Sequence, residues 1–202
     1  MGSQQTSSTT GTVFIADVRN DYNDTSTGHF DASKMLEFLN DGLVDISVKS
    51  QCLEAVESID LADDTLEYSI TTEYVEVKSV HYIDADGKAW ALKDGSPSMV
   101  SLDISENDTD YPAFWYEFAG KIGAYPVLSS RTTETLNVYL SKRAVPIVAA
   151  TNLPIPAAYE NALKYYMLAR MSLVDRDMGR FSTLMNQYLS EIGIMRKDLN
   201  EQ

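Results

Sequence analysis

Residues 30–46, FDASKMLEFLNDGLVDI, contain the clearest helix signal in the chain. Phe30 and Met35 flank Asp31 with the spacing of a hydrophobic staple around an Asp N-cap. Large apolar residues then recur at helical spacing, at Met35, Leu36, Leu39, Leu43 and Ile46. The pattern predicts an amphipathic helix over residues 32–50. Gly42 inside it costs about 1 kcal/mol relative to Ala, and we expect another backbone to approach closely there.

Three more helices are expected outside this stretch. Their apolar residues recur every three or four positions, at Phe14, Val18 and Tyr22, at Tyr159, Leu163 and Tyr166, and at Phe181, Leu184, Tyr188 and Ile192. A turn cluster at residues 23–28 separates the first two helices, and a break at residues 177–179 separates the last two. Short amphipathic helices are marginal alone. We therefore expect the helices from both chain ends to pack together.

Between the second and third helices the apolar period changes to two, which is typical of strands. The alternating residues are Leu66, Tyr68 and Ile70, then Val75 and Val77, then Phe114, Tyr116 and Phe118, and finally Leu136, Val138 and Leu140. The run that begins at Val75 continues through Val80 and Tyr82. Asp86-Gly87 lies between two such runs and predicts a hairpin, because this dipeptide tolerates positive φ angles.

The sequence therefore predicts an α+β fold: a helical bundle of about four helices, two N-terminal and two C-terminal, with a β-rich insert between the second and third helices. The expected division has four parts. These are a disordered N-terminal arm over 1–11, the N-terminal helices over 12–51, the β-rich insert over 52–152 and the C-terminal helices over 153–202.

The charge of the chain is uneven along its length. The formal net charge is −14 over 202 residues. Residues 1–110 hold 22 Asp+Glu and 6 Lys+Arg, a balance of −16, whereas residues 111–202 hold 8 and 10, a balance of +2. A solvated acidic surface explains this, and so does a polar molecule that stacks end to end. Neither explanation favours tight binding of nucleic-acid phosphates. No apolar run is long enough to span a membrane.

Catalytic motifs are missing from the sequence. His29 and His81 have no metal-ligand spacing, and the single cysteine, Cys52, is expected to be a small buried hydrophobe. No phosphate-binding loop or nucleophile elbow occurs. Asp84-Ala85-Asp86-Gly87 lacks the bidentate Glu of a calcium loop, so a hairpin turn is expected there. The sequence thus predicts a non-enzymatic protein with no catalytic residue, no metal site and no cofactor.

The acidic and aromatic clusters of the β-rich segment do not indicate catalysis either. Glu106, Asp108 and Asp110 are expected in a solvated loop, although alternating acids could also hold a divalent ion in a partner's groove. The aromatic residues are Phe114, Trp115, Tyr116 and Phe118. No Lys or Arg interleaves with them before Lys121, which disfavours a base-stacking platform. We expect core packing on one face of this strand and a protein interface on the other.

The order of several short segments is informative when taken together. They are Gly28-His29-Phe30, Leu39-Asn40-Asp41, the hairpin at Asp86-Gly87, the run Pro112…Tyr116…Gly120-Lys121-Ile122…Pro126, the strand Leu136-Asn137-Val138-Tyr139, and Leu153-Pro154 before Tyr159…Tyr166. From about Thr12 to its end, the chain resembles the head-to-tail adaptor proteins of tailed bacteriophages, also called head completion or connector proteins. The strand Leu66-Glu67-Tyr68-Ser69-Ile70 also resembles the family, but Thr71-Thr72 follows it where the family often has a proline.

The resemblance implies a structural virion protein of the phage neck. Such a protein forms a homo-oligomeric ring, typically a dodecamer, that docks on the portal protein, extends the DNA channel and provides a platform for tail or further neck proteins. Packaged DNA passes through without specific binding, and neither catalysis nor a membrane is involved. The implied location is the virion neck, with assembly in the host cytoplasm. Acidic residues would line or flank the channel, and the near-neutral C-terminal helices would face the portal.

The resemblance also suggests two sets of contact residues. The C-terminal segment of such proteins reaches into the portal, which gives Ile192, Met195, Arg196, Lys197 and Leu199 as portal-binding candidates. The alternative is that this helix packs on its own bundle. A subunit or tail interface is assigned to Glu106, Asp108, Asp110 and Trp115. Two other functions stay open: another neck, tail-completion or gatekeeper protein of a phage, and an acidic non-enzymatic protein-binding module.

Overall fold

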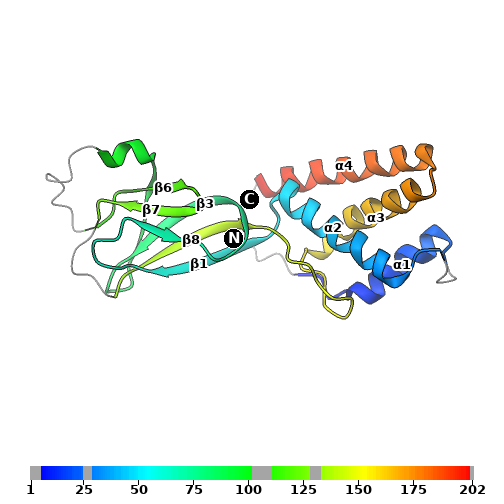
Figure 1. Cartoon of the computed structure of the whole chain (residues 1–202), viewed down its shortest axis with the longest axis horizontal. Coiled ribbons are helices and arrows are strands. Elements are labelled where there is room, and N and C mark those ends of the chain that lie inside the picture. The colour runs from blue at the N-terminus through cyan, green and yellow to red at the C-terminus, as the bar shows by residue number, and fades with distance from the viewer. Residues whose placement is uncertain (1–5, 25–28, 102–110, 128–132, 201–202) are drawn as a thin grey trace. The chain divides into compact units, whose positions relative to one another are not determined.

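The structure is a computed structural model that describes residues 6–24, 29–101, 111–127 and 133–200. Its described part contains four α-helices and two four-stranded sheets (Figure 1), which confirms the predicted α+β class. The helices are α1 (Gly11–Tyr22), α2 (Ala32–Ser50), α3 (Glu160–Val174) and α4 (Met178–Asn200), with short 3-10 helices η1 (Pro97–Ser101) and η3 (Ala157–Tyr159).

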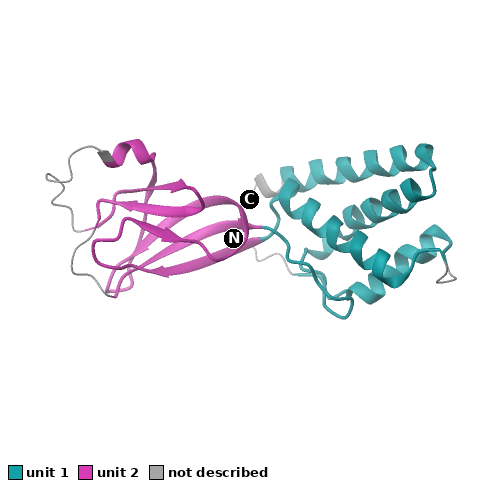
Figure 2. Ribbon diagram, in the orientation of Figure 1, with its two compact units in different colours: residues 1–53, 143–202 teal, residues 54–142 magenta. Residues whose placement is uncertain are grey.

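The chain divides into two compact units, shown in different colours in Figure 2. Residues 1–53 and 143–202 form the helical unit, and residues 54–142 form the β unit. In sequence, the β unit thus separates two segments that fold together. The predicted limits of the β-rich segment, 52 and 152, differ from those of the β unit mainly at the second boundary.

Helix α2 begins at Ala32, the position that the hydrophobic staple and the Asp31 cap predict. The Asp31 carboxylate accepts a hydrogen bond from the Lys34 backbone N–H at 2.6 Å, as an N-cap residue does. Phe30 and Met35, the two staple residues, are 2% and 0% exposed. The helix ends at Gln51, whose left-handed backbone (φ 57°) lets its N–H reach the Ser47 carbonyl. Local chemistry therefore fixes both ends of α2.

The core of the helical unit is built from one stripe of each helix. Leu39 and Leu43 of α2 pack in a single cluster with Leu163 of α3 and Tyr188 of α4, and all four are fully buried. Gly42 lies at the contact between α2 and α3. A Cβ atom there would come within 2.6 Å of Leu163 Cδ1. The predicted close approach at Gly42 is thus made by side chains of α3, rather than by a backbone.

Residues 143–156 belong with the helices because α2 holds them through side-chain hydrogen bonds. The Asn40 amide receives the Ile147 N–H at 2.9 Å and donates to the Ile147 carbonyl at 3.1 Å. The Ser47 hydroxyl accepts the Ala144 N–H at 2.9 Å. These contacts satisfy backbone groups that a strand would otherwise pair, so the chain leaves the β unit at residue 142 rather than 152.

The N-terminal segment is also attached to this connection. Ser7 N donates to the Ile155 carbonyl at 3.0 Å, and Thr12 N donates to the Ala149 carbonyl at 2.6 Å. Ser7 is 3% exposed. The arm predicted to be disordered over 1–11 is therefore ordered from residue 6 onward, because its backbone finds partners in a segment distant in sequence. Residues 1–5 lie outside the described part of the chain.

The β unit contains two sheets, in which neighbouring strands are antiparallel except for β5 and β6. The first has the order β1 (Glu54–Asp60), β8 (Thr135–Lys142), β3 (Tyr74–Ile83) and β4 (Ala89–Ala91). The second has the order β2 (Glu67–Ser69), β7 (Lys121–Tyr125), β6 (Phe114–Phe118) and β5 (Lys93–Asp94).

Strand β8 lies between β1 and β3 and supplies the centre of the β core. Leu136, Val138 and Leu140 are at most 1% exposed, which confirms their predicted common face. The hairpin at Asp86-Gly87 is confirmed too: β3 pairs with β4, and Gly87 has a φ of 80°. Glycine adopts this angle without the steric penalty of other residues.

Candidate interaction surfaces

The acidic, His and Cys side chains of the described residues were the first candidates for a site. No group of three or more His, Cys, Asp or Glu side chains that could hold a metal ion occurs among them. Cys52 is buried in the helical core, as predicted, and His29 and His81 lie in different units. Among the helices of the described part, none is sufficiently long and apolar to cross a membrane. The functional residues left to place are those of the predicted interfaces.

The structure divides the portal-binding candidates on α4 into two groups. Ile192 and Met195 are 6% and 1% exposed and pack in the helical core, so the alternative of a helix packed on its own bundle holds for these two. Arg196 and Lys197 are exposed. The Leu199 side chain lies outside the described residues. Ile192 and Met195 were candidates because the C-terminal segment of the resembling family reaches into the portal. In this chain they lie on the same buried side of α4 as Tyr188.

The predicted subunit or tail interface in the β unit is also altered. Trp115 is 7% exposed and belongs to the β core, so its side chain is not presented at the surface. Strand β6 buries both Trp115 and Tyr116, while Phe118 is 59% exposed. Glu106, Asp108 and Asp110 lie outside the described residues. The exposed aromatic side chain of this strand is therefore Phe118.

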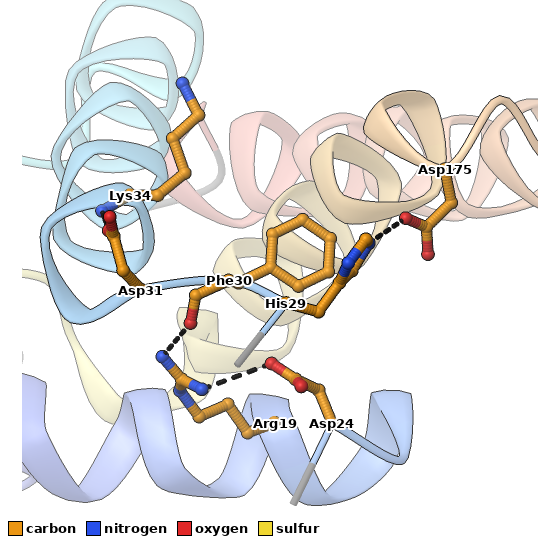
Figure 3. A network of polar contacts seen from close by, with 7 residues as sticks. All are labelled: Arg19, Asp24, His29, Phe30, Asp31, Lys34 and Asp175. Atoms are coloured by element: carbon orange, nitrogen blue, oxygen red, sulfur yellow. Dashed lines mark hydrogen bonds and ion pairs between the residues drawn. The ribbon is translucent and has the colours of Figure 1, made fainter. Parts of the chain in front are cut away.

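A polar network that the sequence did not reveal holds the entry to α2 (Figure 3). Arg19 of α1 pairs with Asp24 at 3.1 Å, and these side chains are only 12% and 6% exposed. The same guanidinium donates to the Phe30 carbonyl at 2.5 Å. A buried charge of this kind is stable only when paired and hydrogen-bonded. Arg19 therefore joins the end of α1 to the staple of α2.

The same region is tied to the end of α3 through Asp175. Its carboxylate lies 2.5 Å from His29 Nε2 (Figure 3). It also accepts a hydrogen bond from the Tyr22 hydroxyl at 2.5 Å. Hydrogen bonds from Tyr22 and then His29 lower the pKa of Asp175. The Arg180 guanidinium lies 4.4 Å above the Tyr22 ring. Tyr22 of α1 and His29, which lies just before α2, thus meet at a carboxylate of the α3–α4 corner.

A third contact anchors α4 on α2. The buried Tyr188 hydroxyl donates to the Asp45 carboxylate, which also pairs with Lys49 at 2.8 Å. Burial, followed by the hydrogen bond to Asp45, raises the pKa of Tyr188. The tyrosine therefore stays a neutral donor at physiological pH, and α4 is held at a defined rotation about its axis.

The uneven net charge follows the two units of the fold more closely than the two halves of the sequence. The β unit holds 17 Asp+Glu against 6 Lys+Arg, a balance of −11, and the helical unit holds 13 against 10, a balance of −3. The split seen along the sequence arose because the first 110 residues include most of the β unit. The acidic surface is therefore mainly a property of the β unit.

Comparison with known proteins agrees with the predicted resemblance. No curated protein matches the chain. The family described as SU10 adaptor protein matches residues 9–201, nearly the entire chain. Proteins of this kind are structural rather than enzymatic and interact with other head or tail proteins of the phage. The chain therefore belongs to the SU10 adaptor protein family and is a bacteriophage head-to-tail adaptor, a structural component of the virion.

Proposed function

We propose that the chain forms a ring of about twelve copies at the phage neck, where it docks on the portal, extends the DNA channel and provides a platform for the tail. Family membership over residues 9–201 is the observation that carries this proposal. In the ring, the helical unit acts as a bundle into which the β unit is inserted, so that each unit serves a different neighbour.

The charge of the β unit supports a role beside the DNA. Its formal charge balance of −11 repels the phosphate backbone of nearby DNA. A basic wall would bind the genome non-specifically and retard it. We therefore assign the β unit to the wall or the rim of the channel, where DNA passes without sticking.

The helical unit, with a balance of −3, is assigned to the portal. Its contact lies at the C-terminal end of α4, where Arg196 and Lys197 are exposed and Ile194 is 53% exposed. These residues replace the buried Ile192 and Met195 as portal-binding candidates. An exposed apolar side chain followed by two basic ones suits a partner surface that combines apolar and acidic groups.

Co-sedimentation with assembled portal tests this assignment. We expect Arg196→Glu combined with Ile194→Asp to reduce the portal-bound fraction at least tenfold. Lys121→Glu, an exposed charge reversal in the β unit, is the matched control and should bind normally. Circular dichroism of each variant checks its folding.

Unchanged portal binding by the α4 variant would refute the assignment of α4. Binding of the unmodified protein to tail proteins but not to portal would refute portal docking itself and indicate a gatekeeper or tail-completion protein.

A further inference from the structure

The two outermost strands of the first sheet of the β unit run in opposite directions. Strands β1 and β4 are its outermost members, and each pairs with a strand on one side only in the described part of the chain. Because β8, β3 and β4 follow β1 with antiparallel pairing at every step, β1 and β4 run in opposite directions. A copy related by a simple rotation would therefore bring its β1 antiparallel to β4 of the first copy.

The side chains on these edges are accessible and differ in character. Alternate residues of β1 are exposed, and Val56 among them is 55% exposed. On β4, Ala89 and Ala91 are exposed on the outer face, while Trp90 lies on the face of its partner Tyr82. A long accessible edge strand is a template for pairing with another chain. The apolar side chain of Val56 and the small side chains of Ala89 and Ala91 could lie side by side on one outer face without a steric clash or a buried charge.

We propose that β1 of one copy pairs with β4 of the next copy, so that a second copy of this chain continues the sheet around the ring. The proposal rests on the ring proposed above and identifies its β contact. The register places Ala89 beside Val56 of the next copy and Lys88 opposite Glu57 of the next copy. In this register the exposed side chains of both strands lie on the same face of the continued sheet. A shift of one residue would place exposed side chains of one strand beside inward-facing side chains of the other.

Pairing of two identical β1 edges is disfavoured by charge. An antiparallel pair centred on Glu57 would place Glu57 opposite Glu57, and Glu54 opposite Asp60. Like charges directly opposite each other destabilise a sheet. Strand β4 contains no acidic residue and is preceded directly by Lys88. The edges therefore favour a head-to-tail contact, which generates a ring when the rotation closes.

Both charges of the proposed pair are already held in place within each copy. The Glu57 carboxylate accepts the Thr71 and Thr72 N–H groups at 2.8 and 2.9 Å. Lys88 Nζ lies 3.8 Å from the centroid of the Trp90 ring. The nearby Asp84 carboxylate accepts two backbone N–H groups of its own turn, at 2.8 and 3.0 Å. Little side-chain ordering remains to be done when Lys88 meets Glu57.

The dimensions agree with a ring around DNA. Four strands span about 19 Å in the direction of the hydrogen bonds, so about twelve copies give a circumference of roughly 230 Å. The proposed register contains only three residue pairs within β4, which spans Ala89–Ala91, and the flanking pair of Lys88 with Glu57. The contact is therefore weak alone and acts together with docking on the portal.

Disulfide trapping tests the proposal in a Cys52→Ala background. Val56→Cys combined with Ala89→Cys should form a ladder of covalent multimers on portal-bound protein under mild oxidation, and reductant should dissolve it. Directly opposite residues in antiparallel strands lie within disulfide distance. Within one copy, β1 and β4 are three strand spacings apart, about 14 Å, which excludes an internal disulfide. The multimers can therefore arise only between copies.

Three control variants sharpen the result. Val56→Cys with Ala91→Cys shifts the register and should yield at least tenfold fewer multimers. Val56→Cys with Lys121→Cys places the second cysteine on the other sheet and measures chance collision. Val56→Cys alone should remain uncrosslinked, and dimers from this variant would overturn the proposal by showing that β1 pairs with β1.

The same trapping is carried out on concentrated protein without portal, so that the two proposals fail separately. Normal portal binding without a ladder in either sample overturns the β1–β4 contact and leaves the proposed function intact. A ladder in the free protein without portal binding supports the contact and overturns portal docking. The absence of both overturns both.

Discussion

The two units of this adaptor are stabilised differently. In the helical unit, charged and polar side chains join elements that are distant in sequence, as when Asn40 clamps Ile147 or Tyr188 donates to Asp45. In the β unit, the strand ladders and the face of β8 that contains Leu136 provide the cohesion. The helical unit carries a balance of −3 and the β unit a balance of −11.

The acidic charge is concentrated in the unit whose core strands are joined mainly by backbone ladders. A sheet satisfies its backbone groups through its ladder, so its outer face can be acidic without loss of core contacts. The helical unit, with a balance of −3, uses several of its charged side chains in contacts between its segments, such as Arg19 with Asp24 and Tyr188 with Asp45. Repulsion of DNA and cohesion of the bundle are thus assigned to separate parts of the chain.

The largest effect that tests this comparison comes from the two cores. Leu39→Ala in the helical unit and Leu136→Ala in the β unit each remove a fully buried leucine, and we expect a loss of about 2–5 kcal/mol of unfolding free energy for each. Both tryptophans, Trp90 and Trp115, belong to the β unit, so their fluorescence reports that unit. Far-UV circular dichroism mainly reports the helices.

In urea unfolding, Leu39→Ala should lower the midpoint of the helical signal more than that of the fluorescence, and Leu136→Ala should do the reverse. Equal shifts of both signals for either variant would show that the units unfold as one, and the comparison between them would lose its energetic meaning.

A smaller effect is expected at the contact between α2 and α3. Gly42→Val forces side-chain atoms into Leu163 and Tyr166, which lie 2.6 and 2.8 Å from a Cβ at this position, and should destabilise the protein by about 1–3 kcal/mol. Gly193→Ala in α4 is the matched control. It has open space around it and should stabilise the helix by about 0.5–1 kcal/mol. Thermal unfolding followed by circular dichroism measures both; a neutral Gly42→Val would mean that α2 and α3 are loosely packed.

The smallest effect concerns pH. Hydrogen bonds from Tyr22 and His29 lower the pKa of Asp175 below its ordinary value of 3.8. The carboxylate therefore contributes stability above this value, and the contribution is lost as the pH falls through the lowered pKa. We expect less than about 1 kcal/mol, because the group is partly exposed. Asp175→Asn should reduce the acid-induced loss of the helical signal and leave the fluorescence transition unchanged; an unaltered acid transition would show that this contact does not support the α3–α4 corner.

Much of the secondary structure could be predicted because its signals are local. The Asp31 cap, the Gly87 turn and the alternation around Val138 each act within a few residues. Strand β1 was missed because three of its seven residues are acidic and its inward face carries only intermediate burial. Strand β5 has two residues and exists through its pairing with β6. The break between α3 and α4 was predicted close to its position, at residues 177–179 rather than 175–177.

The candidate sites were harder to predict than the strands. An apolar stripe such as Ile192 and Met195 looks the same whether it meets its own bundle or a partner, and the cores of both units compete for such residues. Trp115 and Tyr116 point to opposite faces of a strand, yet both are buried, which no alternation pattern indicates. The network around Arg19 joins residues whose proximity depends on the packing of α1 against α2.

The sequence by itself determined the local events: where helices are capped, where the chain turns and which residues of a helix or strand share a face. These follow from hydrogen bonds and steric limits within a few residues. The tertiary structure alone decided which apolar stripes bury one another and that residues 143–156 belong to the helical unit. It also decided that most of the net negative charge lies in the β unit, and that the outer strands β1 and β4 of its first sheet run in opposite directions. Burial and strand pairing depend on contacts between segments far apart in the chain, and a linear pattern does not contain them.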